Sequence, residues 1–189
     1  MTPLDKQHVY VVLDISGSMF GEPLQSMLNG VDGLVSALQS SAEVDVDNTI
    51  VSVIAFSTMA NVVARALPLQ DFGMPEISAG GCTNCARMME SLLREVDGGA
   101  GPGSADAKPP MVFFFMDGYP TDAPSSVENA IRDFRSRNWS AYASFAVAGG
   151  AEKHFLARLT SPRRVFDLTI NPNFAAAIAP LAESVKGGK

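Results

Sequence analysis

Two uninterrupted apolar runs constrain the fold of this chain more than any other feature of its sequence. Residues 9–13 read VYVVL and residues 111–116 read MVFFFM. A strand with one face in water alternates apolar and polar side chains, so an uninterrupted run predicts a strand that is buried on both faces. Strands of this kind occur in parallel sheets that helices cover on each side. The two runs therefore predict an α/β fold.

Segments with the helical spacing of apolar side chains separate the strand-like runs. We expect helices over residues 23–38, 84–96, 125–137, 152–159 and 173–185, and strands over residues 8–13, 49–57, 61–69, 111–116, 141–148 and 164–168. The third strand follows the second after a short link, which predicts an antiparallel hairpin. The alternation predicts an α/β fold with a doubly wound, mostly parallel sheet, one antiparallel edge strand and helices on both faces.

Length and charge exclude several classes of protein. Residues 98–110 predict a surface loop too short to separate two domains, so we expect one domain over residues 1–189. A net charge of −6 without a basic run argues against nucleic acid or an anionic membrane as a partner. No apolar stretch reaches the ~18 residues that span a bilayer. The amino terminus lacks a signal-peptide pattern, and two cysteines make no disulfide framework, so we expect a cytoplasmic protein.

Oxygen-bearing side chains stand where the buried strands end. Ligands of open parallel sheets bind beyond the carboxyl ends of the strands, at the point where the strand order reverses. Three loops expected at that edge read DISGSM, AGGCTNCA and MDGYPTD. If the two buried strands are neighbours, five oxygen groups converge there: Asp14, Ser16, Ser18, Thr83 and Asp117. Hydroxyl and carboxylate oxygens are the ligands of hard divalent cations, which predicts a Mg²⁺ site, with Mn²⁺ or Ca²⁺ as alternatives.

The three motifs, in this order, resemble the von Willebrand factor A (VWA) domain with its metal-ion-dependent adhesion site. The resemblance extends from His8 to about Val185 and is closest to the bacterial intracellular TerY-like proteins associated with tellurite resistance and stress. It implies that Ser16, Ser18 and Thr83 ligate the metal directly, and that the two aspartates act directly or through water. It also implies a Glu or Asp of a partner protein in the remaining position. Many TerY relatives carry additional metal-binding cysteines in a C-terminal extension, whereas residues 1–189 contain only Cys82 and Cys85.

Each site residue also has a purely structural interpretation. Asp14, Ser16 and Ser18 could cap the helix that begins near Pro23, and Thr83 could cap the next helix. Asp117 precedes glycine and could be a turn residue, and Asp122 fits a cap or turn better than a metal ligand. These alternatives stay open at the level of sequence.

The two cysteines flank Thr83 and invite three interpretations. Cys82 and Cys85 could be inert packing thiols, a reversible disulfide that tunes the threonine loop, or zinc ligands. Zinc would need two more ligands, and the isolated His8 and His154 have no finger-like spacing, so we interpret both histidines as ordinary surface or edge residues.

Apolar residues beside the polar loops suggest a protein interface. Met19, Phe20 and Tyr119 could line a docking surface, or could pack locally against the adjoining elements.

An enzyme is the competing functional class. A Mg²⁺-dependent phosphohydrolase could use Asp14 as its nucleophile, but Ser16 stands where the dehalogenase-type enzymes place their acid/base aspartate. No phosphate-binding glycine loop or nucleophile-elbow motif is present, and neither histidine is placed to act as a base. We therefore expect a binding module rather than an enzyme. A third class, a structural relative with an inactive site, does not account for the complete set of five oxygen groups.

Overall fold

The computed structural model describes residues 6–42, 44–98, 110–116, 119–137, 144–148, 153–160 and 165–167. Within them, six strands form one sheet in the order β3-β2-β1-β4-β5-β6. The strands are β1 (Gln7–Asp14), β2 (Thr49–Phe56), β3 (Ala60–Pro68), β4 (Met111–Met116), β5 (Ser144–Ala148) and β6 (Val165–Asp167). Every neighbouring pair is parallel except β2 and β3, which are antiparallel. The expected mostly parallel sheet with one antiparallel edge strand is confirmed.

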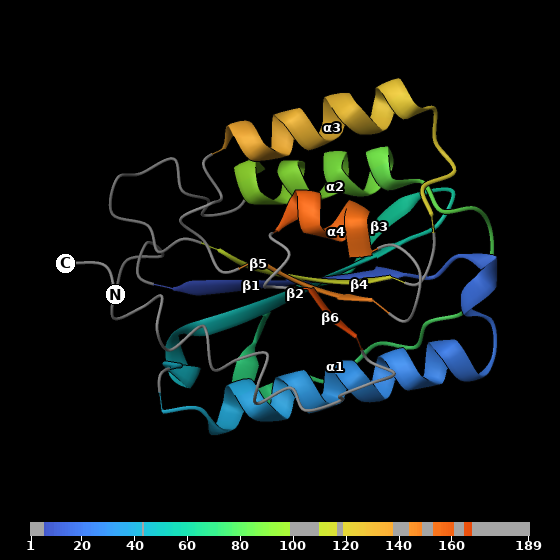
Figure 1. The fold of residues 1–189 in the computed structure, drawn as a ribbon. Helices are drawn as coiled ribbons and strands as arrows, with labels where there is room; N and C mark the ends of the chain where they lie inside the picture. The colour runs from blue at the N-terminus through green and yellow to red at the C-terminus, as the bar shows by residue number, and fades with distance from the viewer. Residues whose placement is uncertain are drawn as a thin grey trace.

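Helices cover both faces of this sheet. Those described are α1 (Glu22–Ser40), α2 (Cys85–Gly98), α3 (Pro124–Ser136) and α4 (Lys153–Leu159). Short 3₁₀ turns lie between strands and helices: η2 (Gly17–Met19) precedes α1, η3 (Val46–Asn48) follows it, and η4 (Leu69–Asp71) lies between β3 and α2. Figure 1 shows α1 on one face and α2, α3 and α4 on the other. The closing helix that we expected over residues 173–185 lies outside the described residues.

The core has two layers, one on each side of the sheet. Val9, Val11 and Leu13 of β1 pack into the layer that contains α1. The alternate residues Tyr10 and Val12 pack into the layer that contains α2 and α3. Both sets are 0–1% exposed, and this double burial is the reason that the strand shows no polar alternation.

The strand order places the end of β1 beside the end of β4. Leu13 of β1 is in register with Phe115 of β4, while β2 lies on the other side of β1. The chain leaves β1 first toward β2 and later returns to build β4, so the order reverses at this point. The condition for convergence of the oxygen groups, that the two buried strands are neighbours, is thereby met.

No described helix is long and apolar enough to cross a membrane.

Candidate metal centre

Asp14 ends β1 as a fully buried carboxylate. Its exposed fraction is 0%, and its Oδ1 accepts a hydrogen bond of 2.8 Å from the backbone N–H of Ser16. A buried carboxylate is costly unless other groups compensate its charge. The N–H donated by Ser16 supplies part of that compensation and turns the chain sharply out of the strand.

The two serines present their hydroxyl groups side by side. Ser16 Oγ and Ser18 Oγ lie 3.1 Å apart, with Ser16 buried and Ser18 exposed. Neither serine caps the helix that follows, because the residue at the N-cap of α1 is Gly21, and no side chain accepts a hydrogen bond there. Ser16 makes no side-chain cap for η2 either. The capping interpretation of this loop is therefore wrong.

The loop that contains Thr83 is joined to the β1 loop by backbone hydrogen bonds. The N–H of Gly17 donates to the carbonyl of Gly81 at 2.9 Å, and the N–H of Gly80 donates to the carbonyl of Ile15 at 2.7 Å. Thr83 itself is only 6% exposed. The structure thus brings together two segments that are more than sixty residues apart in the chain, as the sequence predicts.

The β2–β3 turn supports the same loop from the side. The N–H of Asn84 donates to the Ser57 carbonyl at 2.9 Å, and the N–H of Cys82 donates to Thr58 Oγ1 at 3.0 Å. Gly81 has a φ of +89°, and a Cβ at this position would lie 2.7 Å from Thr58 Oγ1. Only glycine permits this close approach without strain.

Thr83 is not the cap of α2. Asn84 Oδ1 accepts the N–H of Arg87 at 3.0 Å, which makes Asn84 the capping residue. The carboxylate of Asp122 accepts two further N–H groups at the same helix end, those of Cys85 at 2.7 Å and Ala86 at 3.3 Å. The interpretation of Asp122 as a cap holds, although the capped helix is α2 and not its neighbour in sequence, α3.

Four of the five predicted ligands lie within the described residues. Asp117 falls outside them, so its proposed ligation stays a prediction. No group of three or more His, Cys, Asp or Glu that could hold a metal ion occurs in the described part of the chain. The predicted set does not depend on such a group, because three of its five members are hydroxyls.

Cys82 and Cys85 occupy different environments. Cys82 is exposed, whereas Cys85 is 0% exposed and packs in the core with Met88 and Met89 of α2. No disulfide joins the two cysteines in this structure. The environment of Cys85 favours a packing role for that thiol.

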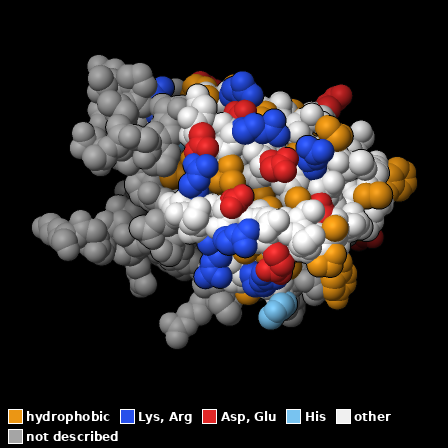
Figure 2. All heavy atoms as spheres, turned by 90° about the horizontal axis from the view of Figure 1, so that it is seen from above, with side chains coloured by type: hydrophobic (Ala, Val, Ile, Leu, Met, Phe, Trp, Pro, Cys, Tyr) orange, Lys and Arg blue, Asp and Glu red, His pale blue; other side chains and the backbone are white. Residues whose placement is uncertain are grey.

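The predicted docking residues divide between core and surface. The prediction that Met19 lines a docking surface is wrong, because this residue is 3% exposed and packs in the same core layer as Met27 of α1. Phe20 and Tyr119 are 80% and 60% exposed. Met59 is a further exposed apolar residue that the motifs did not indicate: it is 60% exposed at the tip of the β2–β3 hairpin, and its place in the short link was the available signal. Hydrophobic side chains protrude at the end of the molecule where β1 finishes (Figure 2).

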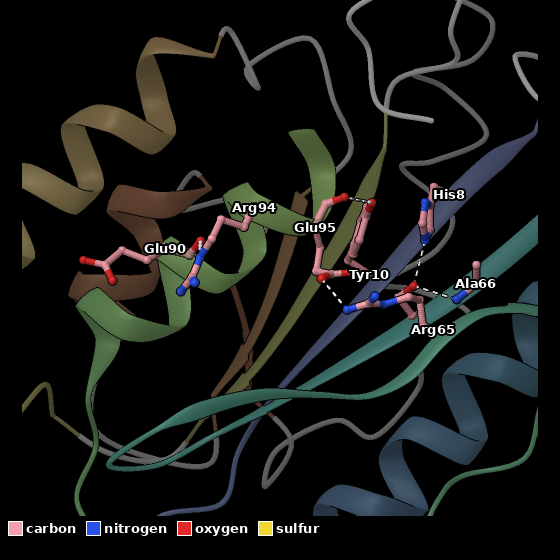
Figure 3. Close-up of polar contacts among 8 residues, drawn as sticks. His8, Tyr10, Arg65, Ala66, Glu90, Arg94 and Glu95 are labelled. Carbon is pink, nitrogen blue, oxygen red and sulfur yellow. Dashed lines mark hydrogen bonds and ion pairs between the residues drawn. The ribbon is translucent and has the colours of Figure 1, made fainter. Parts of the chain in front are cut away.

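The interpretation of His8 as an ordinary surface or edge residue is also wrong. It lies at the amino end of the central strand β1, stacked on Tyr10 with a ring-centroid distance of 4.0 Å, and its Nε2 is 2.8 Å from Ser52 Oγ (Figure 3). Ser52 Oγ also accepts the N–H of Ala66. Burial lowers the pKa of His8 from 6.5 to about 4. His154 is exposed, as expected.

The hydroxyl group of Tyr10 donates a long hydrogen bond of 3.5 Å to the backbone carbonyl of Glu95. Burial, and secondarily the charge of Glu95, raise the pKa of the Tyr10 phenol above its ordinary value. Glu95 in turn pairs with Arg65 of β3 at 2.7 Å. This cluster lies toward the amino end of β1, whereas the candidate metal centre lies at its carboxyl end.

Comparison with known proteins places the fold. The family model for the von Willebrand factor type A domain matches residues 8–179. Similar solved structures include proximal thread matrix protein 1 from the mussel byssus, with a zinc-occupied metal-ion-dependent adhesion site (MIDAS) motif. It has TM-score 0.68 and 16% identity over 95% of this chain and 46% of that chain. Manganese-loaded TRAP protein of Plasmodium vivax has TM-score 0.66 and 15% identity over 94% of this chain and 73% of that chain.

A third similar structure is archaeal. The ArnB paralog VWA2 from Sulfolobus acidocaldarius has TM-score 0.63 and 18% identity over 91% of this chain and 44% of that chain. This chain thus spans less than half the length of the mussel and archaeal proteins. No curated protein matches the sequence. At these identities the likeness to solved structures concerns the fold.

Proposed function

This chain belongs to the von Willebrand factor type A domain family, and from that premise we propose that it is a metal-dependent protein-binding module. A divalent cation held by Ser16, Ser18 and Thr83, with Asp14 and Asp117 direct or through water, would bridge to a Glu or Asp of the partner. We propose Mg²⁺ as the ion, with Mn²⁺ and Ca²⁺ as alternatives, since all three accept oxygen ligands.

The spacing of the two serine hydroxyls is the observation that carries this proposal. Neighbouring ligands of an octahedral Mg²⁺, each at ~2.0–2.1 Å from the ion, lie about 2.9 Å from one another. Ser16 Oγ and Ser18 Oγ lie 3.1 Å apart without serving any helix cap, close to the buried carboxylate of Asp14 in sequence. Neutral hydroxyl ligands leave the ion with much of its positive charge, so it retains affinity for an anionic oxygen from outside.

The charge of the surrounding loops makes the ion the main attraction for an acidic partner. The described segments 15–21, 57–59, 79–84 and 119–123 contain no Lys or Arg. A partner carboxylate would meet no cationic side chain on them. The exposed side chains of Phe20, Met59 and Tyr119 stand on three of these segments and would contact apolar parts of the partner.

We propose that the protein is not an enzyme. A phosphohydrolase that used Asp14 would need an acid/base group and a cation for phosphate. The described segments of this edge contain no His, Lys or Arg, and the carboxylate of Asp122 already accepts the N–H groups of Cys85 and Ala86. The motif details resemble the TerY-like branch, and we extend the proposal to a role in a tellurite or stress response.

Thermal unfolding in EDTA and with added Mg²⁺, Mn²⁺ or Ca²⁺ tests the metal site. An ion that binds only the native state at 100 times its Kd stabilises by about 2.7 kcal/mol, roughly 5–10 °C for a domain of this size. Asp14→Ala should abolish the shift. Because Asp14 is buried, substitution of the exposed Ser18 is a milder test, and Ser18→Ala should reduce the shift in Tm. The control is Ser26→Ala, which replaces an exposed serine of α1 and should leave the shift unchanged. Equal shifts in all variants would refute the site.

A further inference from the structure

Two residues that precede α3, Thr121 and Asp122, form hydrogen bonds to the Thr83 loop and to the start of α2. Both the backbone N–H and the Oγ1 of Thr121 donate to the carbonyl of Thr83, at 2.8 and 3.0 Å. The next residue, Asp122, accepts the N–H groups of Cys85 at 2.7 Å and Ala86 at 3.3 Å. Thr83 is therefore bracketed by hydrogen bonds that come from a segment almost forty residues later in the chain.

Asp122 supplies the acceptors that α2 lacks. The first N–H groups of a helix have no partner within the helix. Asn84 accepts the N–H of Arg87, and Asp122 accepts the N–H groups of Cys85 and Ala86, which lie between Asn84 and Arg87 in the chain. Asp122 precedes α3 by two residues, yet the N-cap of α3 is Ala123, with no side-chain cap. The carboxylate therefore serves the distant helix instead of the adjacent one.

The position of this carboxylate has an electrostatic consequence. The amino end of a helix carries about half a positive elementary charge, which repels a nearby cation. The amino end of α2 begins at Cys85, two residues after Thr83, a proposed ligand. A full negative charge on Asp122, in contact with two N–H groups of that helix end, offsets the repulsion where the cation would bind.

We propose that Asp122 is a positioning residue of the metal site, which acts in two ways without touching the ion. With Thr121 it holds the Thr83 loop in place, and its charge cancels the unfavourable field of the α2 amino end. This inference rests on the proposed cation site and adds to it a residue that determines metal affinity.

The test compares two carboxylate-to-amide substitutions. Asp122→Asn keeps the size of the side chain but removes the charge and one of two acceptors. Asp45→Asn is the matched control, because both oxygens of Asp45 also accept hydrogen bonds, from the N–H and the side-chain amide of Asn48. Asp45 caps η3, which precedes β2 at the opposite edge of the sheet. Mg²⁺ and Mn²⁺ affinities are measured by isothermal titration at low and high salt, and stability is measured in EDTA.

We expect Asp122→Asn to weaken metal binding about 10- to 100-fold, as substitutions behind the ligands of metal sites do. Asp45→Asn should leave the metal Kd unchanged. Because salt screens the field of the helix end, the difference between Asp122→Asn and the wild type should shrink at high salt. A purely structural role would lower stability in EDTA without this salt-dependent change in Kd.

The outcomes separate the two proposals. A wild type that binds no divalent cation would overturn the proposed function, whatever the variant does. A wild type that binds metal, with Asp122→Asn binding it equally well, would overturn the inference about Asp122 alone. If Asp122→Asn fails to fold in EDTA, Thr121→Val takes its place. This variant removes only the hydroxyl hydrogen bond to Thr83 and should still weaken metal binding, and an unchanged Kd would refute the positioning role.

Discussion

His8 illustrates how a single residue can make the stability of this protein depend on pH. Its ring stacks on Tyr10 and bonds to Ser52 in a largely dry environment, which disfavours the protonated form and lowers its pKa to about 4. The unfolded chain binds a proton on this residue at the ordinary pKa of 6.5. Between these two values the unfolded state holds more protons than the native state.

Acid should therefore destabilise the protein through His8. As the pH falls from 6.5 toward 4, the unfolded state gains up to about 3 kcal/mol from this residue, and above pH 6.5 the effect vanishes. His8→Phe keeps an aromatic ring against Tyr10 and removes the titration. Urea unfolding at pH 7 and pH 4.5 should show that the free energy of unfolding falls less at the lower pH in this variant than in the wild type.

The exposed His154 provides the control for this measurement. His154→Gln replaces a histidine with an exposed side chain and should leave the acid dependence of the wild type unchanged. If the free energy of unfolding of His8→Phe falls at pH 4.5 as much as that of the wild type, groups other than His8 cause the acid destabilisation.

At the level of elements, the Thr83 loop depends on its neighbours for its shape. It has no regular secondary structure between residues 82 and 84, and its backbone groups bond instead to the β1 loop, the β2–β3 turn and the segment before α3. Gly81 is the tightest point, with positive φ and with Thr58 and Ser57 close to the position of a Cβ.

Gly81→Ala should disturb this loop. The positive φ and the contact with Thr58 Oγ1 predict a loss of more than about 1 kcal/mol in the free energy of unfolding, together with a smaller metal-induced shift in Tm. Gly80→Ala is the matched control, because no atom lies within 4 Å of its Cβ position and its φ is not positive. Equal effects of the two substitutions, measured by denaturant unfolding, would contradict this explanation.

At the level of the whole molecule, one sheet serves two core layers. Phe113 packs toward α1, and Phe114 packs toward α2 and α3, where it meets Phe134 edge-on with ring centroids 5.9 Å apart. Since both layers share the same strands, neither is expected to persist once the sheet opens. We therefore propose that residues 1–189 unfold as a single domain.

Phe113→Ala and Phe114→Ala test this proposal from opposite faces. Each removes a side chain that is 1% exposed and should cost about 3–5 kcal/mol. Each should also shift one common unfolding transition, seen alike by circular dichroism and by intrinsic fluorescence. Two separate transitions, with each substitution affecting only one of them, would show that the layers unfold independently.

Much of the fold follows from local patterns. The apolar run of β4 was predicted at its observed bounds, and the helix that includes Pro23 in its first turn was predicted within two residues at each end. Strand and helix periodicity are properties of neighbouring residues, and so the sequence alone carries them. For the same reason the end of β1 could be recognised as a candidate site, because Asp14, Ser16 and Ser18 lie close together in the chain.

The sequence predicts that the polar loops share one edge of the sheet, but only the tertiary structure decided which distant side chains pack and bond with one another. The contact of His8 with Ser52 and the capping of α2 by Asp122 each depend on an element distant in sequence. No local pattern distinguishes a carboxylate that caps its own helix from one that caps another, because the choice follows from strand order and crossover connections. The sequence thus determined the elements and the chemistry at their ends, and the packing of the sheet determined how the side chains combine.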